Sequence, residues 1–257
     1  MALTINTNMS SLIVQKNLNA ATSMLNKSIE RMTTGYKINH AADNAAGYSI
    51  ATTWKTQLGS LDVASDNAST GADMLTTLED TYSLITSHLQ RVRDLTEQAA
   101  NGTYGSDSLK AIASEITARL EEIDRISANC EFNGLKMMDG SLTDDINLQV
   151  GLYSDAASRI ALDASLFQNG HVSALFKTFG GVGGATVAEV AKLCSGYDGK
   201  QITGGQNEML NKIDAVISEI SARTTTLGAA QNRIESAVES INVQSENITS
   251  SLSTLRD

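Results

Sequence analysis

The C-terminal part of the chain repeats apolar residues at alternating steps of three and four. The apolar positions are Met209, Ile213, Val216, Ile220, Leu227, Ala230, Ile234, Val238, Ile241, Ile248, Leu252 and Leu255. Only Arg223 and Ser245 interrupt this series. Heptad spacing of this kind keeps one narrow stripe of an α-helix against a partner helix. A helix of this length spans about 70 Å, so the pattern predicts a rod that needs other rods to cover its stripe.

The same spacing predicts three more helices. They are expected over residues 10–32, 44–100 and 106–128, and the C-terminal rod over 206–255. Gly35 stands where a left-handed cap ends the first helix. Asp43 or Asn44 can accept hydrogen bonds from the free N–H groups that open the second helix. Asn101-Gly102 ends the second helix, and Asn133-Gly134 is a turn signal after the third.

Between the rods the period changes to two. Ile146, Leu148 and Val150 alternate with polar residues, and Ile160 and Leu162 do so again after a short polar stretch. Two such runs predict a β-hairpin over 146–162. From 169 to 205 the chain is glycine-rich and weakly patterned, with a short helix expected around 186–193. We expect this middle segment to tolerate changes in length without disturbing the rods.

Composition agrees with thin helical layers. The 257 residues include no proline, which would interrupt helices, and aromatic residues are 4% against an apolar total of 41%. The fold class is therefore predicted as mainly α, an elongated bundle of long antiparallel heptad-patterned helices with a small β-hairpin. The N- and C-terminal rods have complementary stripes, so both chain ends are expected in one bundle.

Charge and cysteine content exclude several functions. The net charge is −10 and the basic residues are scattered, which argues against nucleic acid as a partner. The start lacks a signal peptide, and no run of 18 apolar residues offers a membrane span. Cys130 and Cys194 are too few and too far apart for a disulfide scaffold, so we interpret them as buried or free thiols.

The residues that could carry chemistry do not form a set. His40, His88 and His171 lie far apart and outside the usual zinc-binding spacings. We interpret His88 as a solvated residue beside the apolar stripe rather than a metal ligand. The run at 179–190 is glycine-rich but lacks GK[ST], so it reads as a surface loop and not as a phosphate loop. No enzyme, metal site or cofactor is expected.

Two long segments resemble a known family. Residues 28–57, SIERMTTGYKINHAADNAAGYSIATTWKTQ, resemble the N-terminal signature of bacterial flagellins, and residues 89–134 resemble the flagellin stretch that runs to its F-N-G turn. ALTINTNMSSL near the start and LGAAQNRIESAVESI in the C-terminal rod match as well. The resemblance covers about 1–165 and 205–257. The departures are mild, with Asn44 in place of a second aspartate and Met32 in place of leucine.

The resemblance implies a structural subunit that polymerises into the extracellular flagellar filament for motility. Its implied partners are other flagellin subunits and the flagellar export machinery with a chaperone, which fits the missing signal peptide. The implied organisation has an inner-tube helix at 1–42, an outer helical layer at 43–168 that includes the hairpin, a variable surface-exposed segment at 169–205, and the C-terminal outer-layer helix at 206–257. The residues expected to pack in the inner tube are Val14, Leu18, Leu25 and Met32.

One departure concerns the C-terminus. Flagellins continue past the position that matches Asp257 with another amphipathic helix, which pairs with the N-terminal helix. We expect the chain was cut to prevent polymerisation, although a naturally short product is the alternative. Residues 1–40 should then be mobile or dock on another copy, because a single short amphipathic helix is marginal in water. The chain alone should not form normal filaments.

The resemblance also implies recognition by a Toll-like receptor of animal hosts. The family's contact motif corresponds to Arg91 and Leu95 on the second helix and Glu115 on the third, with Arg119 four residues further on. We expect an exposed arginine beside an exposed leucine, which would also suit a subunit contact. The alternative is that Arg91 only pairs with Asp94 or Glu115 on a solvated face.

Three rival interpretations remain to be weighed. A hook–filament junction protein of the hook-associated class shares the helical ends, but should lack the full SGxxIN…AADxAAG segment. A chemoreceptor-like signalling rod would need a tight hairpin tip and a membrane span. An enzyme in the middle segment is disfavoured because residues 165–205 are few and lack ligand-spaced side chains.

Overall fold

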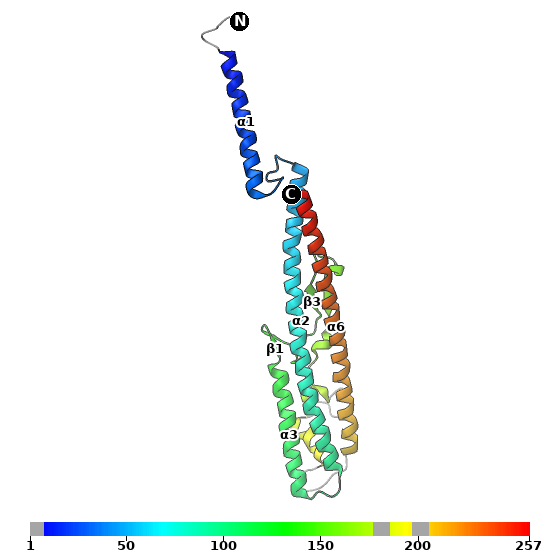
Figure 1. The fold of residues 1–257 in the computed structure, drawn as a ribbon. Coiled ribbons are helices and arrows are strands. Elements are labelled where there is room, and N and C mark those ends of the chain that lie inside the picture. Colours follow the sequence, from blue (N-terminus) through cyan, green and yellow to red (C-terminus); the bar gives the residue numbers. More distant parts are fainter. Residues whose placement is uncertain (1–7, 177–185, 197–205) are drawn as a thin grey trace. The chain divides into compact units, whose positions relative to one another are not determined.

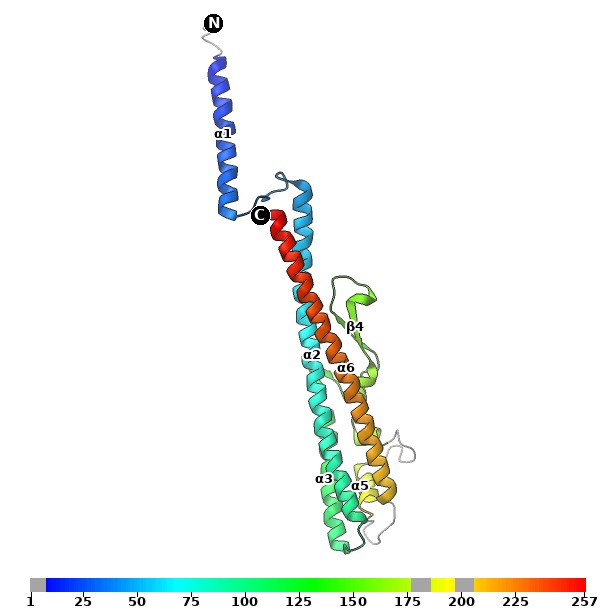
Figure 2. The same ribbon diagram turned by 45° about the vertical axis from the view of Figure 1, so that its right-hand side comes forward.

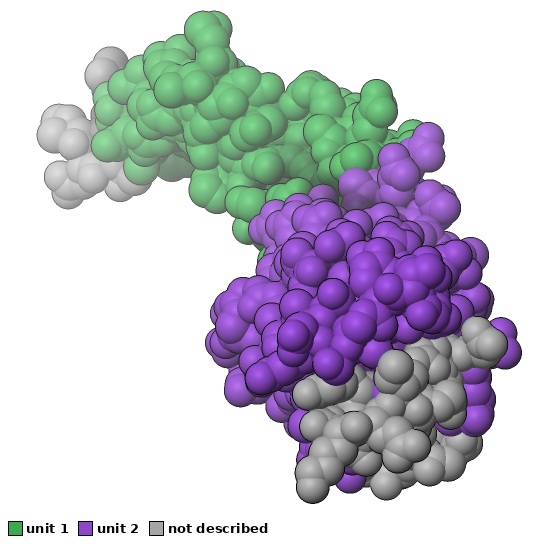
Figure 3. All heavy atoms as spheres, turned by 90° about the horizontal axis from the view of Figure 1, so that it is seen from below, with its two compact units in different colours: residues 1–63, 241–257 green, residues 64–240 purple. Residues whose placement is uncertain are grey.

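A computed structural model describes residues 8–176, 186–196 and 206–257 (Figure 1). Of these residues, 76% are helical. The chain divides into two compact units, one formed by 1–63 with 241–257 and the other by 64–240; Figure 3 colours them separately. The fold is therefore mainly α, as predicted, and each unit is described by itself below.

The helices follow the apolar spacing closely. They are α1 (Met9–Thr34), α2 (Ala45–Ala100), α3 (Ser106–Asn129), α4 (Val172–Leu175), α5 (Val187–Ser195) and α6 (Gln206–Arg256). Short 3₁₀ helices cover Ala156–Ser158 and Ala164–Phe167. All four predicted long helices are confirmed to within two residues at each end, because heptad spacing persists along each one and no proline interrupts it.

Local signals set the helix ends. Gly35 has φ of 74° and its N–H donates to the Arg31 carbonyl at 2.9 Å, the left-handed cap that the sequence predicts. Of the two candidate caps for α2, Asn44 fills the role, since its Oδ1 accepts from the Gly47 N–H at 3.0 Å. Asp43 is thereby left free for another contact.

Two antiparallel strand pairs occur in the described chain. β1 (Glu131–Phe132) and β2 (Leu135–Lys136) flank the predicted Asn133-Gly134 turn, where both turn residues have positive φ, at 50° and 82°. β3 (Ile146–Gln149) pairs with β4 (Arg159–Leu162), with Leu148 opposite Ile160. The predicted hairpin is confirmed.

The second hairpin lies against α2. The Asn67 side-chain amide on α2 donates to the Gln149 carbonyl at 3.2 Å. Gly71, one turn further along α2, faces the Leu148 side chain so closely that a Cβ at this position would collide with it. A glycine in the middle of a helix is unfavourable by itself, so the close approach of β3 accounts for this one.

The core of unit 2 lies between three long helices (Figures 1 and 2). The buried side chains on these helices include Leu75, Leu78, Tyr82, Ile85 and Leu89 of α2, Ile116, Leu120 and Ile123 of α3, and Met209, Ile213, Val216, Ile220 and Leu227 of α6. Nearly all are aliphatic, which agrees with the low aromatic content. These residues are the apolar stripes that the sequence predicts.

The middle of the chain adds to this core. α5 packs against α3, and Val190 and Cys194 on α5 are fully buried, as are Val172 and Phe176 nearby. The expectation of a surface segment that can change in length freely is therefore wrong for these residues. Helices of only four and nine residues are too short to show a periodic pattern in the sequence, yet they bury side chains in the core. Most of the glycine-rich run at 179–190 lies outside the described residues.

One buried charge interrupts the apolar stripe of α6. The Arg223 guanidinium donates through Nη2 to Gln168 Oε1 at 2.7 Å and through Nε to Glu219 Oε1 at 3.4 Å. Tyr82, which faces the same region, donates its hydroxyl to the Leu166 carbonyl at 2.8 Å. Burial raises the pKa of this tyrosine, and the Arg223 charge opposes that rise.

Both cysteines are free and buried, as the sequence predicts. Burial raises the pKa of the Cys130 thiol, and it raises the pKa of Cys194 to about 12. Since the thiolate is the reactive form, both native thiols should be inert toward alkylating reagents in the folded chain.

Unit 1 has a much smaller core. Along its part of α2 and α6 the buried side chains include Ala51, Leu61 and Ile241. Trp54, Leu58, Ile248, Leu252 and Leu255 are only partly covered. Helix α1 has no buried residue at all, so its position within unit 1 depends on contacts other than apolar packing.

Candidate functional site

The first candidate surface is the apolar face of α1. The four predicted inner-tube residues are all exposed: Val14 by 65%, Leu18 by 63%, Leu25 by 58% and Met32 by 85%. Other exposed large apolar residues on this helix are Met9, Leu12, Ile13, Met24 and Ile29. With 3.6 residues per turn, Ile29 continues the stripe of the four predicted residues, whereas Met9, Leu12, Ile13 and Met24 lie on the opposite side of the helix. An exposed apolar stripe of this kind usually marks an interaction site. The structure places these residues together on one helix without a partner in the described part of the chain.

The second candidate surface joins α2 and α3 through an ion-pair cluster. Arg91 donates from Nε and Nη2 to Glu115 Oε1, each at 2.9 Å. Arg119 approaches the same oxygen through Nη2 at 3.9 Å. All three side chains are partly exposed. The structure therefore brings Arg91, Glu115 and Arg119 together, and it selects Glu115 rather than Asp94 as the partner of Arg91.

The fourth residue of the predicted contact is placed differently. Leu95 is only 2% exposed, so the expectation of an exposed leucine beside Arg91 is wrong. Leu95 and its neighbour Thr96 are both buried, because this part of α2 packs against more than one helix and buries a face wider than one heptad stripe. Leu95 belongs to the core and can act on a surface contact only by supporting it.

Sequence reasoning missed the contact of a second arginine on α2, Arg93. Arg93 donates from Nε to Asp214 Oδ1 on α6 at 2.5 Å and also pairs with Glu97 at 3.3 Å. The hydrogen bond from Arg93 to Asp214 raises the pKa of this guanidinium above its ordinary value. The two partners are 121 positions apart, so no local spacing could have indicated the pair.

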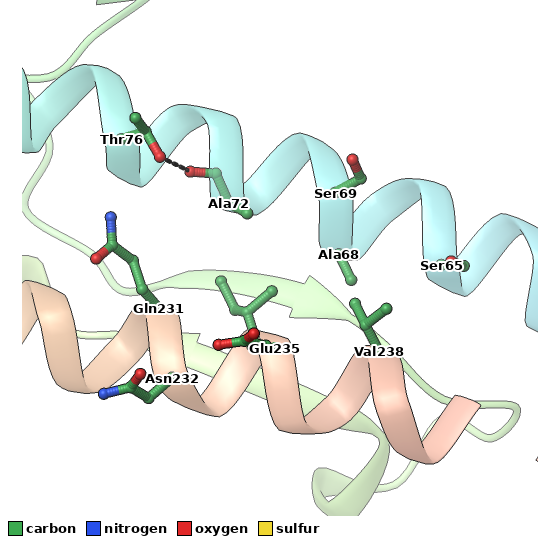
Figure 4. A pocket seen from close by; sticks show the side chains of 10 residues that line it. Ser65, Ala68, Ser69, Ala72, Thr76, Gln231, Asn232, Glu235 and Val238 are labelled. Carbon is green, nitrogen blue, oxygen red and sulfur yellow. Dashed lines mark hydrogen bonds between the residues drawn. The ribbon is translucent and has the colours of Figure 1, made fainter. Parts of the chain in front are cut away.

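A shallow groove of about 570 Å³ runs between α2 and α6 within unit 2 (Figure 4). It is lined by Ser65, Ala68, Ser69, Ala72, Thr76, Gln231, Asn232, Ile234, Glu235 and Val238. The side chains from α2 are small, and Glu235 is the one carboxylate among the lining residues. This lining offers no nucleophile–base pair, so we assign no chemistry to the groove.

The histidines also lack a catalytic or metal-binding arrangement. Among the described residues, no three His, Cys, Asp or Glu side chains gather as metal ligands would. His40 pairs with Glu30 at 2.7 Å and His171 with Asp124 at 3.3 Å. His88 is half-buried rather than fully solvated, and desolvation lowers its pKa.

Comparison with known families matches both ends of the chain. The model of the bacterial flagellin N-terminal helical region matches residues 5–143, and that of the C-terminal helical region matches residues 210–257. The chain belongs to the bacterial flagellin family. This is a family of structural proteins and not of enzymes, which agrees with the absence of a catalytic set among the described side chains.

Curated flagellins are similar along most of the chain. Phase 1 flagellin of Salmonella naestved and the flagellin of Salmonella dublin are each 40% identical over 204 residues, which are 79% of this chain and 39% of theirs. This flagellin chain thus spans about two fifths of the length of the curated relatives it matches.

Solved structures share the fold. A chain described as a flagellar hook-associated protein from Vibrio parahaemolyticus has a TM-score of 0.69 at 12% identity, covering 83% of this chain and 99% of that one. Bacillus cereus FlgL has a TM-score of 0.60 at 18% identity, covering 78% and 99%. At these identities the likeness concerns the fold alone. No helix in the described part of the chain is long and apolar enough to cross a membrane.

Proposed function

We propose that this flagellin chain is a structural subunit of the extracellular flagellar filament that serves motility. The observation that carries the proposal is the uncovered apolar face of α1, together with membership of the flagellin family. A helix that buries none of its apolar residues within its own chain gains stability only from a partner. In the proposed filament, Val14, Leu18, Leu25 and Met32 find that partner in the inner tube.

The proposed partners follow from the same role. They are other flagellin subunits, and the flagellar export machinery with its chaperone, which would carry the chain out of the cell. We place residues 1–42 in the inner tube and residues 43–168 and 206–257 in the outer helical layer. Residues 169–205 would lie at the outside of the filament, except for Val172, Phe176, Val190 and Cys194, which are buried in the core of unit 2.

Filament formation can be tested by extending the chain with a further helix. We expect the 257-residue chain to remain free of long, regular filaments, because α1 then has no inner-tube partner. The same chain extended after Asp257 by the C-terminal segment of a Salmonella relative should form filaments after seeding, as seen by electron microscopy and by sedimentation.

Two outcomes would contradict these expectations in different ways. If neither chain assembles although both are folded by circular dichroism, the filament role is wrong. If both chains form regular filaments equally well, the role stands but the requirement for a helix paired with α1 is wrong. A matched control is the extended chain with Leu18→Ser and Leu25→Ser on α1, which should lose assembly while the fold of unit 2 is unchanged.

We further propose that a host Toll-like receptor recognises the surface around Arg91, Glu115 and Arg119. The geometry supports this because the three side chains lie together, partly exposed, across two neighbouring helices. Arginine is enriched at the energetic centres of interfaces. The same surface would also suit contact with a neighbouring subunit, and the two roles are compatible.

Replacing Arg91 with alanine should weaken receptor activation about tenfold or more, since truncation of a central interface arginine typically costs more than about 1–2 kcal/mol of binding. The change should cost less than about 1 kcal/mol of stability, because the pair with Glu115 is partly exposed. Receptor-reporter cells measure the activation. Arg125→Ala is the matched control, because Arg125 is also exposed and paired, to Glu122 on its own helix. Equal activation by the parent and both variants would refute the assigned site.

A hook-associated role is the alternative to a filament subunit. The solved structure from Vibrio parahaemolyticus that is described as hook-associated supports only a shared fold. The segment TGYKINHAADNAAG, residues 34–47, carries the flagellin signature that a hook-associated protein should lack. The filament role is therefore the one we propose.

A further inference from the structure

The loop between α1 and α2, residues 35–44, is bound to the C-terminal end of α6. The Lys37 N–H donates to the Arg256 carbonyl at 2.5 Å, and the Arg256 guanidinium lies 3.9 Å from the centre of the Tyr36 ring. All these residues belong to unit 1, and Figures 1 and 2 both show the loop beside the C-terminus. One end of the loop is thus fixed to a helix of the bundle by a backbone hydrogen bond and a cation–π contact.

The other end of the loop is held by Asp43. Its Oδ2 accepts hydrogen bonds from the backbone N–H groups of Asn39 and His40, both at 3.2 Å. Its Oδ1 faces the Lys27 ammonium at 2.5 Å and the Arg31 guanidinium at 3.9 Å, both on the last turns of α1. The Asp43 side chain is only 7% exposed. One carboxylate therefore connects the loop backbone to α1.

The loop is also packed tightly against the start of α2. Ile38 is buried, and a Cβ added to Gly47 would lie 2.8 Å from its Cδ1 atom. Because Ile38 and the α2 cap leave no space there, the loop cannot shift toward α2 without displacing a buried side chain. The loop is therefore held in place against α2 and α6. The direction of α1 depends on how this helix is attached to the loop.

Apolar packing cannot orient α1, since this helix buries no residue. We propose that Asp43 is the positioning residue that fixes the direction of α1, through Lys27 and Arg31, and so presents the apolar face of the helix for assembly. The assembly role of that face rests on the proposed function. The orientation itself is a property of the isolated chain and can be measured without filaments.

The charges around Asp43 define how the contact depends on pH. The hydrogen bond from Lys27, and next the backbone N–H of His40, hold the pKa of Asp43 well below its ordinary range. A carboxyl with a lowered native pKa contributes its full stabilisation above its unfolded pKa, near 4, and loses it as the pH falls through the native value. The contact with Lys27 should therefore persist at pH 4, where an ordinary aspartate is about half protonated.

The other charged groups of this region have separate roles. Glu30 on α1 pairs with His40 at 2.7 Å on the exposed side of the loop. Arg256 lies on Tyr36, and the Asp257 carboxylate accepts from the Ser253 hydroxyl. Loosening of α1 only in acid therefore points to Asp43.

Distance measurement between spin labels tests the proposal on the isolated chain. Labels at Ser23→Cys on α1 and Ser250→Cys on α6 both lie at exposed positions of unit 1, and the buried native thiols should remain unlabelled. We expect one narrow distance distribution in the parent. Asp43→Asn should broaden it at least twofold, since asparagine has one acceptor oxygen and turns an NH₂ group toward Lys27 or the loop. Amide exchange at Asn39 and His40 should accelerate at least tenfold.

Two further variants separate positioning from a merely structural role. Lys27→Met removes the largest cause of the lowered Asp43 pKa. The distance distribution of this variant should therefore broaden at a pH at least one unit higher than that of the parent. Lys27→Arg keeps the charge and should behave as the parent does. Glu30→Gln is the matched control and should leave the distribution narrow at every pH. Circular dichroism checks that helix content is unchanged.

The possible results distinguish this inference from the proposed function. A parent distribution that is already broad, or Asp43→Asn and Lys27→Met distributions as narrow as the parent's, would overturn the positioning role whatever the filaments do. If the Asp43→Asn variant does not fold, the Lys27→Met variant, which changes a partly exposed side chain, still tests the positioning role. If both variants broaden as expected but the extended chain never assembles, the positioning role stands and the filament role fails.

Discussion

Replacing Leu95 with alanine is expected to lower the free energy of unfolding by about 2–5 kcal/mol, the usual cost of deleting a buried leucine side chain. Leu95 is 2% exposed and lies beside Val92 and Thr96, which are fully buried. The loss includes both the transfer of the removed methyl groups and the cavity that remains, because neighbouring helices relax only in part. Urea unfolding followed by circular dichroism measures it.

Leu84→Ala is the matched control, because Leu84 stands on the same helix but is 48% exposed. It should cost less than about 1 kcal/mol, in proportion to the smaller apolar area it covers. If Leu95→Ala and Leu84→Ala lower the free energy of unfolding equally, Leu95 is not buried as the structure places it. The result also decides how receptor data are interpreted, since a loss of activation in Leu95→Ala would reflect a disturbed core and only Arg91→Ala reports on the surface.

Replacing Gly71 with alanine is expected to destabilise the chain by about 1–2 kcal/mol. Alanine gains roughly 0.5–1 kcal/mol over glycine within a helix, but its Cβ would collide with Leu148 on β3, and overpacking typically costs about 1–3 kcal/mol. Leu148 can escape only by leaving its place against α2, where the hydrogen bond from Asn67 to Gln149 holds the strand.

Gly228→Ala gives the opposite sign. Gly228 also lies inside a long helix, but no atom comes within 4 Å of a Cβ built there, so alanine should stabilise by about 0.5–1 kcal/mol. Thermal or urea unfolding of both variants gives the comparison. When Leu148 is shortened to alanine, the new Cβ at position 71 no longer collides with it. The double variant Gly71→Ala/Leu148→Ala should therefore be more stable than Leu148→Ala alone. If Gly71→Ala stabilises as much as Gly228→Ala, the close approach of β3 to α2 is wrong.

The long helices and the hairpin could be predicted from the sequence because each repeats one period over many residues. The apolar steps along 209–255 are specific for a helix, and the alternation over 146–162 is specific for strands. Both patterns also indicate where the element begins and ends. The Gly35 cap was predictable for a similar reason, since few residues tolerate a left-handed conformation. The packing of α5 on α3 was not, because nine residues show too short a pattern.

The exposure of Leu95 was mispredicted for a geometric reason. Residues four apart share one face of a helix, so Arg91 at the surface suggested Leu95 at the surface. A helix that contacts more than one neighbour has a buried face wide enough to include adjacent positions, as Met74 with Leu75 shows elsewhere on α2. Spacing along one helix does not reveal how many neighbours it has.

The contacts of Asp43 could be predicted only in part. The sequence offered Asp43 and Asn44 as alternative caps for the same helix, and only one of them was needed. That redundancy was the available signal, because a second acceptor beside a filled cap is free to bind elsewhere. Its partners, Lys27 and Arg31, lie across a turn of the chain whose course no periodic pattern describes.

The buried Arg223 has a consequence for the alignment of the long helices. Apolar stripes of similar side chains can slide past one another by one heptad, about 10 Å, with little change in the area they bury. Such a slide would move the guanidinium away from Gln168 and Tyr82 and set it against aliphatic side chains, where a charge without hydrogen bonds is costly. A single polar position thus selects one register for α6 against its neighbours, as a lone polar residue does in coiled coils. A chain that folds from an unfolded state would then reach one alignment rather than several.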